Sequence, residues 1–220
     1  MPIQLSLVLA ALAGAAVAAA SLLLGKRFFR RPSPPGPPRG EPTEWDRRFM
    51  AYHEAGHAVA SRHLPERPPL EWITIDPSDA AFGMIRTALR PHHNETRRSL
   101  LSTVGVLLAG RIAEELFLGE VTTSGIHDLA AARRLAADMV VDLGMGERSG
   151  TALPPDDLPP GSDTMNLRDA DIRRILSDAD GEVRELLSRH GDELRRLAGK
   201  LLAEKTLAEA EINAFFAETD

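Results

Sequence analysis

The stretch "AYHEAGHAVAS", Ala51 to Ser61, places His53 and His57 four residues apart, with Glu54 directly after the first histidine. On an α-helix, side chains four residues apart lie on one face, about one turn from each other. Two imidazoles so arranged can share one zinc ion at about 2 Å each and leave a position open for water. Glu54 could then accept a proton from that water, whose pKa the zinc lowers. The alternative is a helix that carries two surface or capping histidines.

The residues around the histidines favour a helix that packs closely into a core. Gly56 costs about 1 kcal/mol inside a helix, and the close approach of another element would justify it. Thr43 and Asp46 form a weak capping box that starts the helix, and Pro65 stops it. We therefore predict a helix over 44–63. Its small apolar face consists of Ala51, Ala55, Ala58, Val59 and Ala60.

The rest of the chain predicts a mainly α domain with one small β element. Alternating, β-branched segments at 71–76 and 82–89 indicate two antiparallel strands joined by a polar turn. A last helix is expected to start at a capping box of Thr206 and Glu209 and to end at Glu218. Apolar periodicity and end signals predict the other helices over 96–118, 126–143, 169–189 and 192–204, with a loop over 150–164.

Composition limits the kinds of site that this chain can build. Its 220 residues are enough for one domain of ordinary size or two small ones. It contains no cysteine, so any metal must be bound by histidines and carboxylates. The net charge of −6 shows no overall basic balance, and we expect no nucleic-acid partner.

The first residues of the chain predict a membrane anchor. Residues 3–24 carry no charged side chain, and this run is long enough to cross roughly 30 Å of hydrocarbon. A basic cluster follows at 26–31, and the positive-inside rule puts it and everything after it in the cytoplasm. We therefore expect a single-pass protein at the cytoplasmic face of a bacterial-type inner membrane. The alternative is an apolar targeting segment that is removed.

A proline-rich stretch separates this segment from the folded part of the chain. Residues 32–42, "PSPPGPPRGEP", predict a stiff, extended spacer of roughly 3 Å per residue. The expected organisation is a transmembrane anchor at 1–25, a basic and Pro-rich linker at 26–42, and a metallopeptidase domain at 43–220.

A zinc site on the first helix needs a third protein ligand. Asp128 is attractive because it lies in the first turn of a predicted helix, where an anionic side chain is favoured. Other carboxylates remain candidates, and so do the histidines at His63, His92, His93 and His127. Glu114 and Glu115 are expected to form an ion pair with Arg111, and support of the zinc site is their alternative role.

The segment "LLAGRIAEELFLGEVTTSGIHDLAAARRLAADMVVDLGM" at 107–145, together with the histidine stretch, resembles the peptidase domain of FtsH-type membrane proteases. The resemblance extends over roughly 43–218. It implies a zincin-type, mostly helical domain with a small β element beside the cleft. It further implies His53, His57 and Asp128 as zinc ligands and Glu54 as the catalytic base.

The same resemblance favours an open edge strand near the cleft, to which an extended substrate could add as a further strand. The substrate would then lie along Gly83, Met84 and Ile85, although an ordinary hairpin is the alternative. Family members degrade unfolded or membrane proteins as hexameric rings, which makes a homo-oligomer possible here.

The family's ATPase module is not expected in this chain, because the 220 residues contain no G-x-x-x-x-G-K-[ST] motif. We therefore expect a membrane-anchored zinc metalloendopeptidase that acts on unfolded or membrane-associated polypeptides without a motor of its own. One alternative is a non-catalytic, zinc-binding module that recruits partners. Another is a peptidase that pairs with a separate ATPase chain.

Overall fold

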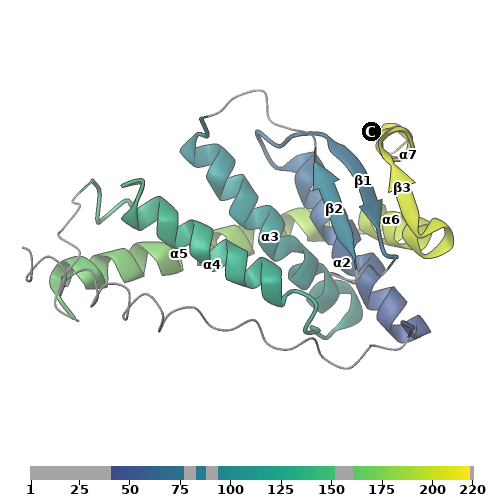
Figure 1. Ribbon diagram of the computed structural model, residues 1–220, viewed down its shortest axis with the longest axis horizontal. Coiled ribbons are helices and arrows are strands. Elements are labelled where there is room, and N and C mark those ends of the chain that lie inside the picture. Colours follow the sequence, from purple (N-terminus) through teal and green to yellow (C-terminus); the bar gives the residue numbers. More distant parts are fainter. Residues whose placement is uncertain (1–40, 77–82, 88–93, 152–160, 219–220) are drawn as a thin grey trace, which may run out of the picture. The chain divides into compact units, whose positions relative to one another are not determined.

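A computed structural model describes residues 41–76, 83–87, 94–151 and 161–218 of the chain (Figure 1). The chain divides into two units, Met1–Glu41 and Pro42–Asp220, and every described residue except Glu41 belongs to the second. The predicted anchor at 1–25 lies outside the described residues and stays a prediction. Among the helices that are described, none has both the length and the apolar character needed to span a bilayer.

Helix α2 (Glu44–His63) carries the histidine stretch, as predicted. Its capping box is formed: the Thr43 hydroxyl accepts the Asp46 N–H at 3.2 Å, and the Asp46 carboxylate accepts the Thr43 N–H at 2.8 Å. Helix α3 (Arg97–Leu118) packs against α2. A β-carbon on Gly56 would lie 2.6 Å from Ala113 Cβ, so the close approach expected from this glycine is confirmed.

Three further helices pack around the α2–α3 pair, and all were expected from the sequence (Figure 1). They are α4 (Ile126–Val141), α5 (Asp163–Arg189) and α6 (Gly191–Glu204). Helix α3 ends at Gly119, whose φ of 79° is the left-handed conformation that glycine adopts readily.

Two ends among helices α2 to α6 differ from the prediction by more than one residue. Helix α4 ends at Val141 rather than near Leu143. Helix α5 begins at Asp163, earlier than the predicted residue 169, because the Ser162 hydroxyl accepts the Met165 N–H at 3.4 Å and provides an N-cap.

A three-stranded antiparallel sheet lies beside these helices, in the order β2–β1–β3. The predicted antiparallel pairing is confirmed between β1 (Leu70–Thr74) and β2 (Met84–Thr87), and the predicted turn between them lies outside the described residues. Within the described part of the chain, β2 pairs on one side only, with β1, and therefore forms an edge of the sheet.

The third strand, β3 (Thr206–Ala208), was not predicted, and the expected helix start at Thr206 is wrong. These residues pair with Trp72–Thr74 of β1, and α7 (Glu209–Ala217) begins only after them. The Glu211 carboxylate, rather than Glu209, accepts the N–H of Ala208 at 2.8 Å. Pairing with β1 satisfies the backbone of this segment and overrides the local capping signal.

Candidate metal centre

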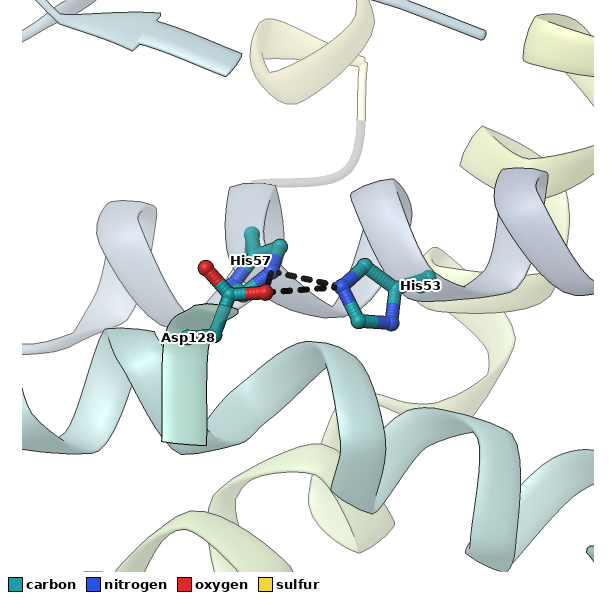
Figure 2. Close-up of side chains that lie close together, drawn as sticks. All are labelled: His53, His57 and Asp128. Atoms are coloured by element: carbon teal, nitrogen blue, oxygen red, sulfur yellow. Dashed lines mark hydrogen bonds and ion pairs between the residues drawn. The ribbon is translucent and has the colours of Figure 1, made fainter. Parts of the chain in front are cut away.

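Three side chains from two helices converge on one point (Figure 2). The Nε2 atoms of His53 and His57 lie 3.0 Å apart. Asp128 Oδ2 lies 3.2 Å from the first and 3.6 Å from the second. Ligand atoms around a tetrahedral zinc ion, each bonded at about 2.0–2.1 Å, are separated by roughly 3.3 Å. The three donor atoms therefore match one triangular face of such a site.

The outer nitrogens of both imidazoles are engaged by protein acceptors. His57 Nδ1–H donates to the carbonyl of Val106 at 2.7 Å, and His53 Nδ1–H donates to the carboxylate of Glu114 at 2.6 Å. A neutral imidazole has one N–H, so this arrangement leaves the Nε2 lone pairs facing each other. Facing lone pairs repel unless a cation lies between them. Two imidazoles and one carboxylate, oriented in this way, fit a zinc ion.

The charges around this point favour a cation. Burial lowers the pKa of His53, but hydrogen bonds to Asp128 and Glu114 outweigh it and raise that pKa to about 10. Burial likewise opposes ionisation of Asp128, yet hydrogen bonds from the two histidines hold its pKa well below the usual range. The cluster therefore attracts positive charge, which a proton on His53 or a metal ion can supply.

Glu54 provides a buried carboxylate next to the first histidine. Its side chain is 6% exposed, and burial raises its pKa, although the charges of His57 and His53 act in the opposite direction. Gly83 lies directly against it, since a β-carbon on this glycine would collide with Glu54 Oε1. A carboxyl group with a raised pKa beside a metal site is suited to accept and return a proton.

The structure therefore brings together all four residues that the sequence analysis assigned to the metal site and the base. The predicted substrate strand also lies nearby: Gly83 contacts Glu54, and β2 begins at Met84. Met84 is exposed and Ile85 packs partly into the core, so the strand presents one side to solvent and one to the domain.

Gly110 of α3 makes room for the paired imidazoles. A β-carbon at this position would lie 2.6 Å from Nε2 of both His53 and His57. Sequence reasoning did not assign this residue a role. The signal that could have found it is its place one turn before Glu114 on the same helix face.

The expected pairing of Glu114 with Arg111 is wrong. Arg111 faces Glu115 at 3.7 Å, and Arg184 binds the same Glu115 at 2.7 Å. Glu114 is instead fully buried and hydrogen-bonded to His53. Glu114 therefore supports the metal site, which is the alternative role that the sequence left open. Because Glu114 is buried, the surface arginines pair with Glu115 instead.

The remaining histidines lie elsewhere or outside the description. His63 hydrogen-bonds Glu193 at 2.7 Å and stacks on His190, so it belongs to a separate cluster. His127 is exposed beside Asp128. His92 and His93 lie outside the described residues.

The model of peptidase family M41 matches residues 41–215. The chain belongs to this family. The match covers most of the predicted peptidase domain, and the resemblance to FtsH-type proteases is confirmed.

Curated relatives include "ATP-dependent zinc metalloprotease FtsH" of Nitrosococcus oceani, 33% identical over 189 residues, which covers 79% of this chain and 29% of the relative. The corresponding protein of Thermobaculum terrenum is 37% identical over 184 residues, covering 77% of this chain and 28% of the relative. "ATP-dependent zinc metalloprotease FTSH 9, chloroplastic/mitochondrial" of Oryza sativa is 38% identical over 170 residues, covering 75% and 21%. The chain thus spans less than a third of the length of these relatives.

Proposed function

We propose that this M41 chain is a zinc-dependent metalloendopeptidase that hydrolyses peptide bonds of unfolded or membrane-associated polypeptides. The observation that carries the proposal is the convergence of His53, His57 and Asp128 next to the buried carboxylate of Glu54. The curated relatives, which are named zinc metalloproteases, support the choice of metal.

Each of the residues at the site has a separate role in the proposed hydrolysis. A zinc ion held by the three donors would supply a Lewis acid for the scissile carbonyl and lower the pKa of a bound water to about 7. Glu54 accepts the proton of the attacking water and returns it to the leaving amine. Glu114 and the Val106 carbonyl keep the two imidazoles in the tautomer and orientation that direct Nε2 toward the metal.

Substrate is proposed to bind along the free edge of β2, at Gly83, Met84 and Ile85. An extended polypeptide would add there by main-chain hydrogen bonds, a mode that tolerates many sequences. The contact between Gly83 and Glu54 supports this placement, because a chain bound along β2 would start beside the proposed base.

The 220 residues carry no nucleotide-binding motif, and we propose that cleavage is limited to segments that are already open. Without a motor, only chain that is already locally unfolded can pair with β2 and reach the site. We further propose that residues 3–24 anchor the protein in a bacterial-type inner membrane, with the peptidase domain on the cytoplasmic face, and that copies of it can assemble.

The test is zinc-dependent proteolysis by the full chain, purified in mild detergent. Zinc is removed with a chelator and added back, with unfolded casein and a stably folded protein as substrates, each with and without ATP. We expect cleavage of casein alone, loss of cleavage on chelation, recovery with zinc, and no effect of ATP. Stoichiometric zinc binding without cleavage of any substrate would instead identify a zinc-binding module, and stimulation by ATP would contradict motor-free action.

A further inference from the structure

The Glu114 carboxylate accepts hydrogen bonds from two separate parts of the metal site. Its Oε1 accepts His53 Nδ1–H at 2.6 Å and the Ser124 hydroxyl at 2.7 Å, while its Oε2 accepts the backbone N–H of Thr122 at 2.6 Å. A carboxylate oxygen has two lone pairs, so both donors to Oε1 can bind at once. Glu114 therefore joins a metal ligand of α2 to the turn between α3 and α4.

The hydroxyls in this turn form a directed chain of hydrogen bonds. Because the Ser124 hydrogen goes to Glu114, the Thr122 hydroxyl must donate to Ser124 Oγ, at 2.6 Å. Ser124 N–H in turn donates to Thr122 Oγ1 at 3.2 Å. Hydrogen bonds in such chains polarise and strengthen one another. Ser124 is the member that connects the turn's own hydrogen bonds to Glu114.

The turn leads directly to the third candidate ligand. Gly125 follows Ser124 and is buried against the His53 ring: a β-carbon at this position would lie 3.4 Å from His53 Cε1. Helix α4 starts at the next residue, and Asp128 lies in its first turn. Ser124 therefore stands between Glu114, which orients His53, and the helix start that carries Asp128.

We propose that Ser124 is a positioning residue, whose hydroxyl holds the start of α4 against Glu114 and so keeps Asp128 and His53 at bonding distance from one metal ion. This inference rests on the proposed zinc site and adds a residue to it. Ser124 touches neither the substrate nor the metal. Its effect is on how tightly the metal is held.

The test compares the zinc affinity and zinc release rate of the full chain with those of Ser124→Ala, measured by competition with a chromophoric chelator. Changes to residues that support metal ligands typically weaken binding by about 10–100-fold. Ser124 acts on His53 chiefly through Glu114, since its own Oγ lies 3.5 Å from His53 Nδ1, so we expect a loss near the lower end, about tenfold. Ser124→Thr retains the hydroxyl and should bind zinc within about twofold of the unchanged chain.

Thr123→Ala is the matched control, because Thr123 lies in the same turn and its hydroxyl has no hydrogen-bond partner among the described residues. It should leave zinc affinity unchanged. Equal or tighter zinc binding by Ser124→Ala, failure of Ser124→Thr to restore affinity, or an equal loss in Thr123→Ala would each overturn the inference. If the unchanged chain binds no zinc at all, the proposed function fails first, and the two failures are thereby distinguished.

Discussion

Helix α2 contributes histidines to two clusters, each of two histidines and one carboxylate, that differ in geometry. One contains His53, His57 and Asp128, and the other contains His63, His190 and Glu193. In the first, the two rings meet edge to face at 80°, with centroids 4.7 Å apart. In the second, the rings stack at 21° with centroids 3.7 Å apart.

This difference in ring orientation decides what each cluster can bind. A histidine lone pair lies in the plane of its ring, so two crossed rings can direct their lone pairs to one point. Rings stacked at 21° direct theirs along nearly parallel planes, an arrangement poorly suited to a shared ion. His63 Nε2 is in addition already hydrogen-bonded to Glu193 at 2.7 Å. Two histidines and an acid therefore do not define a metal site unless their lone pairs converge.

The largest effect should appear in catalysis, when the carboxylate beside the first cluster is compared with the carboxylate of the second. Glu54→Gln removes the proposed base and should lower the rate of casein cleavage by about 10³-fold, within the range for general-base removal. Zinc content should stay at one ion per chain. Glu193→Gln makes the same chemical change in the second cluster and should keep the rate within about twofold. Equal losses in the two variants would break the comparison.

Zinc binding should separate the two histidine pairs next. His57→Ala removes a proposed ligand and should weaken zinc binding by more than about 100-fold. Changes to residues that only support a ligand typically weaken binding by up to about 100-fold, and loss of a ligand should cost more. His190→Ala should retain one zinc ion with unchanged affinity. Metal analysis after dialysis against dilute chelator measures both. Loss of zinc from His190→Ala would show that the stacked cluster also binds metal.

A glycine pair tests how closely α3 must approach the crossed rings. Gly110→Ala would place a β-carbon 2.6 Å from both Nε2 atoms, and we expect zinc binding to fall by at least tenfold. Gly199→Ala on α6 is the control, because no atom lies within 4 Å of its β-carbon position. This control should stabilise the chain by up to about 1 kcal/mol through helix propensity. Unchanged zinc affinity in Gly110→Ala would contradict the packing that we describe.

The smallest effect concerns the pH dependence of stability in the stacked cluster. Burial, and then the charge of His63, lowers the pKa of His190 below its usual value of 6.5, against the attraction of Glu193. As the pH falls through 6.5, the unfolded chain binds this proton first, so the folded state loses stability. His190→Gln should therefore lose less stability than the unchanged chain between about pH 7.5 and 5.5.

Urea unfolding of the metal-free protein at the two pH values measures this difference. Because the same buffers and chelator are used for both chains, the contributions of titrating groups that do not interact with His190 cancel in the comparison. An identical loss of stability in His190→Gln would show that this histidine is not perturbed by its neighbours.

Local signals in the sequence were sufficient for the first helix and for the position of Asp128. The capping box of Thr43 and Asp46 and the spacing of His53 and His57 involve residues within one turn of each other. Short-range geometry of this kind depends little on the rest of the chain. The same reason explains the correct end of α3 at Gly119.

Tertiary structure decided the features that join distant segments. Thr206–Ala208 became a strand because β1 offered a partner, and Glu114 became a support of His53 because the packing of α3 on α2 buried it. The sequence alone therefore determined which side chains could bind a metal and on which helices they lie. Only the folded chain decided that the rings of His53 and His57 cross while those of His63 and His190 stack, because ring orientation is set by hydrogen bonds from other segments.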